Sequence, residues 1–284
     1  MTNKAANSKE YIISSSERRS LINLSELWRY RELFGVLSWR DLSVRYKQTI
    51  LGILWAIFQP FATMIIFTFI FNNLANIQSG DGTPYPIFIY IGLLLWQLFS
   101  GIIKDSSQSL TSNANLIQKI YFPRIIIPSS VVLTALVDFI CGSIILVFLM
   151  VWYGFAPHLI GLLILPVLII CSISSAMGIG LFLSALNVKY RDVSHIVPFF
   201  IQLLLFVTPV IYPIKILAGF NFIKTLMIWL NPMAGIIDCA RAGIIGKSMV
   251  DWNALIISIV VSLLMFSLGL LYFKRTENYF ADNI

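Results

Sequence analysis

The stretch Arg45–Pro60, RYKQTILGILWAIFQP, changes from basic to apolar within a few residues. Its basic side chains end at Lys47, and from Ile50 onward no charged side chain occurs before Asp81. A basic flank that meets a long uncharged apolar segment is typical of the point where a chain enters a lipid bilayer. The stretch therefore predicts a first membrane span that begins near residue 50.

The composition of the whole chain also indicates a membrane protein. Of 284 residues, 58% are hydrophobic and 12% are charged, and the mean hydropathy is +0.85. A water-soluble domain carries about 25% charged residues, so these charges are too few to cover a surface that faces water on all sides. The isolated Cys141, Cys171 and Cys239 predict neither a disulfide framework nor a metal site. We expect an all-α polytopic membrane protein.

Six segments are apolar over the roughly 20 residues that a helix needs to cross a bilayer. They form a predicted transmembrane domain, 49–274, with spans at about 50–72, 86–104, 126–153, 159–187, 194–213 and 251–273. Between the last two spans, 220–245 holds two short apolar pieces separated by Asn231-Pro232. Pieces of this length are more often re-entrant than spanning, so we expect a re-entrant periplasmic helix pair.

The distribution of lysine and arginine predicts that both termini are cytoplasmic. With this orientation, sixteen of these residues lie inside and four outside, as the positive-inside rule requires. We expect a polar tail over 1–23 and a cytoplasmic tail over 275–284. Between the first tail and the first span, 24–48 alternates aromatic and charged residues, which predicts an amphipathic helix at the membrane interface.

Two features inside the predicted spans admit more than one interpretation. Asp138 is costly at membrane depth and should face the protein interior, where it would bond to Ser, Thr or Asn, line a hydrophilic path, or carry protons. Small residues four apart over Ser172–Asn187 predict close helix packing, either within the bundle or at a dimer seam.

No catalytic or nucleotide-binding motif is apparent in the sequence. The two histidines, His158 and His195, have no local signature of a catalytic triad around them. GIIGKS at Gly243–Ser248 lacks the glycine that a phosphate-binding loop needs five residues before Gly246. We therefore expect a protein that is not an enzyme and binds no metal.

Four motifs, in order along the chain, resemble one family. They are WRDLSVRYKQTILGILWAIFQP (Trp39–Pro60), NLIQKIYFPRIIIP (Asn115–Pro128), LNVKYRDV (Leu186–Val193) and NPMAG (Asn231–Gly235). The chain is similar here to the permease subunits of ABC transporters that export O-antigen, capsule or teichoic acid chains. The resemblance extends from Leu24 to about Phe273.

This resemblance implies a homodimer in the inner (cytoplasmic) membrane, with two separate ATPase subunits that bind ATP and Mg. It implies export of a polysaccharide linked to an undecaprenyl-diphosphate-type lipid, and we expect no nucleic acid partner. The polar segment after the second span, 112–121, would be the coupling helix; the alternative is a solvated loop. The residues expected at the ATPase are Asn115, Gln118, Lys119, Tyr121, Arg124, Lys189, Arg191 and Asp192. The re-entrant turn would contain Asn231, Pro232 and Gly235.

The same resemblance suggests where the substrate would bind. Arginine recognises phosphate bidentately, so the expected lipid-diphosphate entrance is Arg40, Arg45 and Lys47. Aromatic faces and hydrogen-bonding groups would bind sugars weakly along the path. The expected channel lining is Trp55, Phe58, Gln59, Trp96, Phe99, Asp138, Phe206 and Tyr212, although the aromatic residues among them also suit ordinary lipid-facing positions.

Three other functions are weighed against this one. A permease that exports drugs or small molecules would share the architecture. An ion-coupled carrier would need several intramembrane acids and inverted repeats, whereas Asp138 is the only such acid expected and no repeat is obvious. A glycan-processing enzyme would need a pair of carboxylates, which the spans lack.

Overall fold

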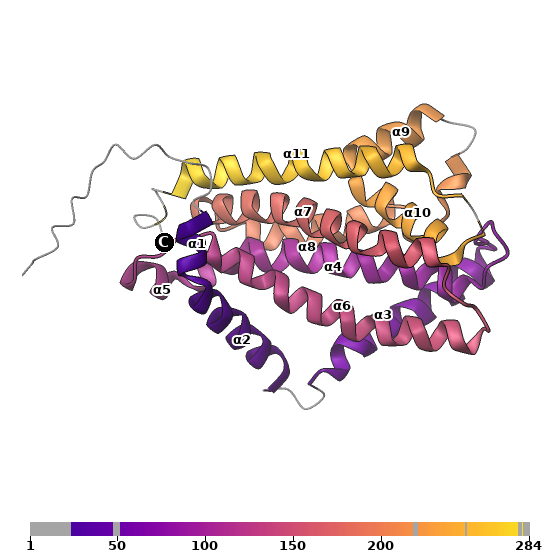
Figure 1. Ribbon diagram of the computed structural model, residues 1–284, viewed down its shortest axis with the longest axis horizontal. Coiled ribbons are helices and arrows are strands. Elements are labelled where there is room, and N and C mark those ends of the chain that lie inside the picture. Colours follow the sequence, from indigo (N-terminus) through magenta and orange to yellow (C-terminus); the bar gives the residue numbers. More distant parts are fainter. Residues whose placement is uncertain (1–23, 48–51, 218–220, 248, 278–279, 281–284) are drawn as a thin grey trace, which may run out of the picture.

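The computed structural model describes residues 24–47, 52–217, 221–247, 249–277 and 280; the predicted tail 1–23 lies outside them. These residues form an elongated helical bundle with no strand among them (Figure 1). The all-α polytopic prediction is thereby confirmed. The elements are α1 (Leu24–Arg29), α2 (Arg31–Lys47), α3 (Leu54–Phe67), the π-helix η1 (Thr68–Leu74), α4 (Tyr85–Ser112), α5 (Ala114–Lys119), α6 (Ile126–Trp152), α7 (Leu159–Lys189), α8 (Val193–Val207), the 3-10 helix η2 (Ile214–Leu217), α9 (Asn221–Leu230), α10 (Pro232–Ile245) and α11 (Trp252–Thr276).

Five helical segments are long and apolar enough to cross a membrane: α3 with η1, α4, α6, α7 and α11. α8 is apolar but has only 15 residues, and it ends before the predicted limit at 213. Thr208, at the end of α8, has an extended backbone and precedes Pro209, and the residue before a proline disfavours the helical conformation. The chain after α8 therefore continues without regular helix.

α4 is the central helix of the bundle and packs chiefly against α6 and α7. In its most apolar stretch 78% of the residues are buried inside the protein, against 11% for α3. α4 also runs past its predicted end at 104, through a serine-rich segment. Ser107 and Ser109 are buried there and donate hydrogen bonds to the carbonyls of Lys104 and Ser106, both at 2.7 Å. Packing thus stabilises a helix whose local propensity is weak.

Close backbone contacts join α7 to its neighbours. A Cβ atom on Gly178 would overlap the backbone of Met265 in α11, and one on Gly269 would overlap the carbonyl of Gly178. Gly180 faces Ser106 of α4, whose Cβ lies 2.8 Å from the position that a Cβ would take. These two glycines of the small-residue segment therefore pack within the chain, as small residues do at helix crossings in membranes.

Replacement of Gly178 by alanine should lower the stability of the protein in detergent by about 1–3 kcal/mol, the usual cost of overpacking. Gly35→Ala is the matched control, because no heavy atom lies within 4 Å of its added Cβ and alanine favours a helix by about 1 kcal/mol. Thermal unfolding of both variants measures the difference. A Gly178→Ala variant as stable as the parent would contradict the close α7–α11 contact.

The non-helical chain after α8 is buried, so its backbone needs partners inside the protein. Thr208, Val210 and Ile211 are at most 2% exposed. The hydroxyl of Tyr85, at the start of α4, donates to the carbonyl of Ile211 at 2.7 Å. Asn231, between α9 and α10, donates to the hydroxyl of Thr208 at 2.7 Å. Unpaired backbone groups at membrane depth are costly. The hydroxyl of Tyr85 supplies a partner for one of them, and Asn231 holds the side chain of Thr208.

Arg241 of α10 supplies the largest share of these hydrogen bonds. Its guanidinium donates to the carbonyls of Phe88 at 3.0 Å and Pro209 at 2.6 Å, and to that of Val210. It also lies 3.6 Å from the ring centroid of Phe88, and the residue is 5% exposed. One buried arginine thus joins α10, α4 and the chain that follows α8.

Replacement of Arg241 by methionine should destabilise the fold strongly, because the buried carbonyls of Pro209 and Val210 would lose their donor at about 1–3 kcal/mol each. We expect loss of a monodisperse protein in detergent, or a melting temperature far below that of the parent. Arg191→Met, at an exposed position, is the matched control and should leave stability unchanged. Equal stability of the two variants would contradict the role of Arg241.

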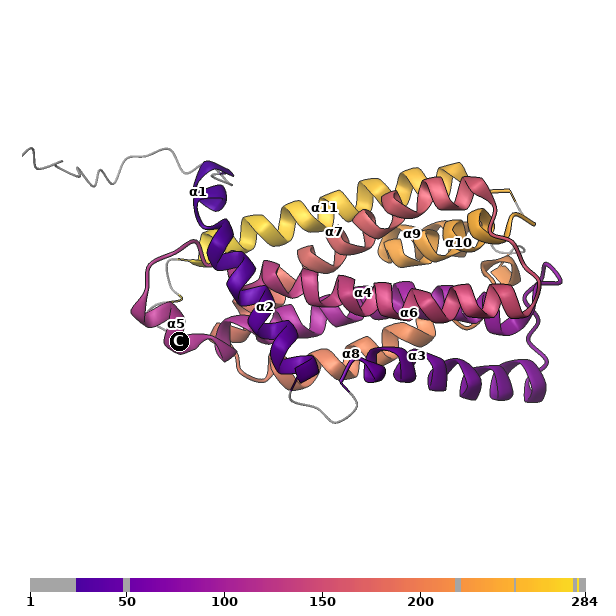
Figure 2. The ribbon, with the colours of Figure 1, turned by 60° about the horizontal axis from the view of Figure 1, so that its bottom comes forward.

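α9 and α10 meet at a bend of 107°. The side chain of Asn231 accepts a hydrogen bond from the backbone N–H of Met233 at 3.1 Å, and Pro232 occupies the first turn of α10, which is a favoured way to start a helix. Gly235 lets α10 approach α11, since a Cβ there would meet Ser258 and Ala254. Both helices lie in the half of the bundle away from α5 (Figures 1 and 2).

A second contact fixes α9 against the start of α11. Lys224 donates to the carboxylate of Asp251 at 2.9 Å, and Asp251 also caps α11 by accepting from the N–H of Ala254 at 3.1 Å. The hydrogen bond from Lys224 lowers the pKa of Asp251. The carboxylate of Asp251 therefore stays charged at neutral pH, and its contact with Lys224 joins α9 to the start of α11.

Candidate functional site

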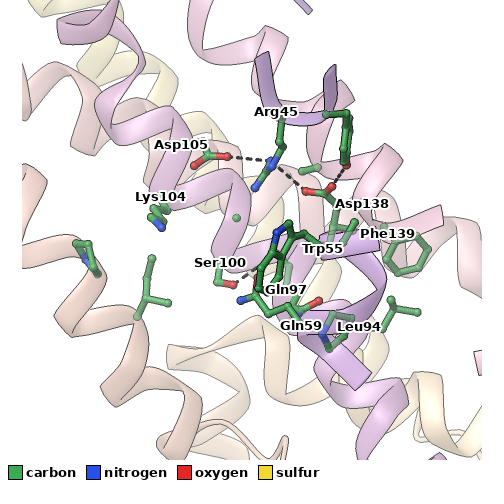
Figure 3. Close-up of a pocket in the computed structure, with 18 of the residues that line it drawn as sticks. Arg45, Trp55, Gln59, Leu94, Gln97, Ser100, Lys104, Asp105, Asp138 and Phe139 are labelled. Atoms are coloured by element: carbon green, nitrogen blue, oxygen red, sulfur yellow. Dashed lines mark hydrogen bonds and ion pairs between the residues drawn. The ribbon is translucent and has the colours of Figure 1, made fainter. Parts of the chain in front are cut away.

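A polar cavity of about 400 Å³, called here the deep cavity, lies among α3, α4, α6, α8 and the end of α2 (Figure 3). Its polar lining residues are Arg45, Tyr46, Gln59, Gln97, Ser100, Lys104, Asp105, Asp138 and Gln202. Polar and charged side chains within a membrane domain are rare, because the bilayer penalises them. Their convergence on one cavity marks it as the candidate site.

α4 contributes the longest polar stripe to this cavity. Gln97, Ser100, Gly101 and Lys104 follow one another at helical spacing and so lie on one face of the helix. Figure 3 shows Gln97 and Ser100 beside Gln59 of α3, with Lys104 farther along α4. Amide and hydroxyl groups offer both donors and acceptors, so this wall can hydrogen-bond a polyhydroxylated ligand.

A charged network borders the deep cavity at the end of α2. Arg45 Nη1 lies 3.0 Å from Asp138 Oδ2 of α6 and 3.4 Å from Asp105 Oδ2 of α4 (Figure 3). The hydroxyl of the neighbouring Tyr46 donates to the other oxygen of Asp138. Two adjacent residues of α2 therefore hold this helix against both α4 and α6.

The network shows which residues contact Asp138, a point that the sequence left open. Its partners are Tyr46 and Arg45 of the interface helix, and not the Ser, Thr or Asn of a neighbouring span. Burial raises the pKa of Tyr46, and the hydrogen bond to Asp138 raises it further. The phenol therefore remains the protonated donor, and Asp138 both accepts from it and lines the cavity.

A second hollow of about 550 Å³ lies between α2, the end of α4 and the start of α6, on the side of α5. It is called here the α5-side hollow. Its lining residues are Arg40, Asp41, Val44, Arg45, Asp105, Gln108, Ser109, Ser112, Asn113, Ile127, Val131 and Thr134. Hydroxyl and amide groups again predominate among the residues that α4 contributes.

Comparison with known proteins decides the family. The ABC-2 type transporter family matches residues 32–245, about three quarters of the chain. The chain belongs to this family. It is 29% identical over 261 residues to the O-antigen export system permease protein RfbA of Myxococcus xanthus, covering 91% of this chain and 98% of that protein. It is 30% identical over 253 residues to the protein of the same name from Klebsiella pneumoniae, with 88% and 94% covered.

A more distant relative has a different polysaccharide in its name. The polysialic acid transport protein KpsM of Escherichia coli is 23% identical over 244 residues, with 84% of this chain and 91% of that protein covered. The resemblance to polysaccharide-exporting ABC permeases is thereby confirmed. As a member of the ABC-2 family, the chain is a transport component and not an enzyme.

The three cations expected at the entrance of this ABC-2 permease do not converge on one point. Nε and Nη2 of Arg40 both donate to Oδ1 of Asp41, at 2.9 and 2.7 Å. Lys47 lies 5.1 Å from the ring centroid of Trp39. Arg45 lines both the deep cavity and the α5-side hollow, and Arg40 lines the second of these. Of the three cations, Arg45 is therefore the one that lines both spaces.

The expected channel lining divides into two groups. Trp55, Gln59 and Asp138 line the deep cavity, and Phe58 is exposed beside it, with its ring edge-on to Trp55 at 5.7 Å between centroids. The others lie elsewhere. Trp96 and Phe99 are 4% and 3% exposed and pack in the core, Phe206 is exposed on α8, and the hydroxyl of Tyr212 donates to the carbonyl of Val207 at 2.9 Å.

Several cavity residues were missing from the sequence-based prediction. They are Tyr46, Gln97, Ser100, Lys104, Asp105 and Gln202. The stripe on α4 has a readable signal, because Gln97, Ser100 and Lys104 recur at three and four residues within one span. Tyr46, Asp105 and Gln202 have no such signal, since only the folded chain brings them to the cavity. No cluster suited to a metal ion occurs in the described ranges.

The segment expected to contact the ATPase forms one end of the bundle (Figures 1 and 2). Seven of its eight predicted residues are exposed: Asn115, Gln118, Lys119, Tyr121, Lys189, Arg191 and Asp192. α5 itself has six residues, with Asn113 between it and α4. Beyond α5, Ile120 and Tyr121 are 55% and 83% exposed. Exposed apolar side chains next to cations suit a protein interface.

Arg124, the eighth predicted residue, is held by the C-terminal part of the chain. Its backbone N–H donates to the Glu277 carboxylate at 3.2 Å, and its guanidinium donates to the Glu277 carbonyl. The guanidinium also lies 5.9 Å from the ring centroid of Phe280, and this ring packs edge-on to Phe273 at 5.2 Å. Glu277 and Phe280, which belong to the predicted cytoplasmic tail, therefore fix the chain that follows α5.

Loss of this contact should impair transport without unfolding the protein. We expect Glu277→Ala together with Phe280→Ala to leave membrane insertion intact and to lower transport per ATP hydrolysed, because the chain after α5 loses its anchor. Arg29→Ala, an exposed change on α1, is the control. Reconstitution with the ATPase subunit measures both rates. Unchanged coupling in the double variant would contradict this role.

Proposed function

We propose that this chain is the channel-forming permease subunit of an ABC exporter that moves a lipid-diphosphate-linked polysaccharide across the cytoplasmic membrane. Its relatives are named for the export of O-antigen and of polysialic acid. The observation that carries the proposal to this chain is the deep cavity. Its wall combines Gln59, Gln97, Ser100 and Gln202 with the indole of Trp55, a chemistry that suits sugars and not an apolar drug.

A homodimer would complete the path around this cavity. α3 and α8 border the deep cavity, yet both are mostly exposed, and the buried residues of α8 are Val193 and Val197. A second copy of the chain facing α3 and α8 would enclose the cavity between two permeases. Weak, repeated contacts to amide, hydroxyl and aromatic groups would let a polymer slide instead of binding it tightly.

ATP hydrolysis would take place in two separate subunits, which also bind Mg. The exposed residues around α5 and the turn between α7 and α8 would contact these subunits. We place this end of the bundle and both termini in the cytoplasm. The sixteen lysine and arginine residues assigned to the inner side by the sequence then lie on the cytoplasmic side of the membrane. α9 and α10 would then form the re-entrant pair at the outer face, a position supported by their confinement to the far half of the bundle.

The test is export by cavity variants in cells that lack their own permease. Gln97→Leu combined with Gln202→Leu should lower the amount of surface glycan by about thirtyfold, because each of the two lost hydrogen bonds costs about 1 kcal/mol. Gln78→Leu makes the same change at an exposed loop position and should export normally. Immunoblots of surface glycan measure the effect, and membrane levels of the chain check its folding.

Three results would overturn the proposal. The first is normal export by the double glutamine variant, which would remove the deep cavity from the path. The second is solute movement by the purified chain under an ion gradient without any ATPase, which would favour an ion-coupled carrier. The third is export of drugs instead of glycan by the reconstituted complex, which would indicate a small-molecule exporter of the same family.

A further inference from the structure

The deep cavity and the α5-side hollow follow one another along the same two helices. On α4, the residues that line the deep cavity lie between Leu94 and Asp105, and those that line the α5-side hollow lie between Asp105 and Ser112. On α6 the α5-side hollow ends at Thr134 and the deep cavity begins at Ala135. The two spaces therefore form consecutive sections of one polar route beside α4, about 27 Å long at 1.5 Å per helical residue.

The residues common to both spaces are Arg45 and Asp105, which are paired with each other. Arg45 also contacts Asp138 at 3.0 Å from the opposite wall. The side chain of Arg45 thus crosses the route from α2 and touches carboxylates on both α4 and α6 (Figure 3). The two spaces therefore meet at this three-residue contact.

The charges at this point balance in the observed arrangement. Arg45 and Lys104 carry positive charge, and Asp105 and Asp138 carry negative charge. An anionic ligand that approached from the α5-side hollow would meet two carboxylates as well as a cation. It would bind only by replacing the two carboxylates as the partner of the Arg45 guanidinium. A diphosphate can do so because arginine binds phosphate oxygens bidentately. The freed carboxylates would then be repelled by the same ligand.

We propose, building on the function proposed above, that the contact of Arg45 with Asp105 and Asp138 seals the deep cavity from the α5-side hollow. The diphosphate of the lipid carrier opens this seal by replacing the two carboxylates at Arg45. The polymer behind the diphosphate then meets a continuous polar route. Arg45 thereby makes opening depend on the anionic group that all lipid-diphosphate-linked glycans share.

Thiol accessibility tests the seal directly, in membrane vesicles that hold the full chain with its ATPase subunits. In a background where the buried Cys141, Cys171 and Cys239 are replaced by alanine, Ser100→Cys reports on the deep cavity. Ser112→Cys reports on the α5-side hollow. A membrane-impermeant thiol reagent is added from the side of α5. We expect rapid modification at position 112 and slow modification at position 100.

Opening of the seal should accelerate modification at position 100 only. With Asp105→Asn and Asp138→Asn together, we expect the rate there to rise by about tenfold, the factor that about 1.4 kcal/mol provides. Arg45→Gln should have a similar effect, and Arg45→Lys a smaller one because the charge remains. Equal rates at position 112 in all variants show that folding is preserved. Arg29→Gln, an exposed charge change outside both spaces, should leave both rates unchanged.

The ligand is tested with farnesyl diphosphate, a short soluble isoprenyl diphosphate, and with farnesol as its uncharged control. Farnesyl diphosphate should accelerate modification at position 100 by about 5- to 150-fold, the usual range of coupling between sites. Farnesol should have no effect, and Arg45→Gln should abolish the response. If farnesyl diphosphate does not accelerate modification at position 100 while the carboxylate variants do, the diphosphate is not the ligand that opens the seal. The seal itself would still be supported by the carboxylate variants.

A rate at position 100 that no variant of Arg45, Asp105 or Asp138 alters would overturn the seal itself. This result would leave the proposed function intact, because glycan export by the glutamine variants is measured independently of thiol accessibility. Conversely, loss of the export function would not change the effect of the carboxylate variants. The two failures are therefore distinguishable.

Discussion

Every backbone carbonyl and N–H at membrane depth needs a partner within the protein, and this requirement governs the region after α8. A helix of 15 residues is about 22 Å long and leaves part of the bilayer to irregular chain. Arg241 and Tyr85 donate to carbonyls of that chain, and Asn231 donates to the hydroxyl of Thr208 at its start. The break after α8 and the bent α9–α10 pair are therefore parts of one arrangement, since α10 carries the arginine on which the irregular chain depends.

Much of the fold follows from length and apolarity, which identified the membrane class and all the long helices. Two limits of such reasoning are visible. Hydropathy does not distinguish α4, which is buried by protein, from α3, which is exposed, because protein interior and lipid are equally apolar. Serine-rich sequence after Lys104 suggests a loop, yet contacts with neighbouring helices such as that of Asn187 with the carbonyl of Ser107 keep it helical.

The candidate site was accessible from sequence only in part. Arg45, Trp55, Gln59 and Asp138 could be named because a charge or polar group next to an apolar run is visible locally. The contact of Arg45 with Asp105 joins residues that are 60 apart in sequence, and no local pattern encodes it. Aromatic residues were harder to assign, since a tryptophan or phenylalanine suits the core, the lipid and a sugar-binding wall equally well.

The continuity of α4 has a mechanical consequence. This helix has 28 residues, about 42 Å in length, and contains no proline or glycine between its polar cavity face and Ser112 except Gly101. A single residue, Asn113, separates it from α5. A force that displaces α5 would therefore act on a continuous helix and not on a flexible linker. The wall of the deep cavity would shift together with α5, so that a force applied at that end of the bundle would reach the cavity through one continuous helix.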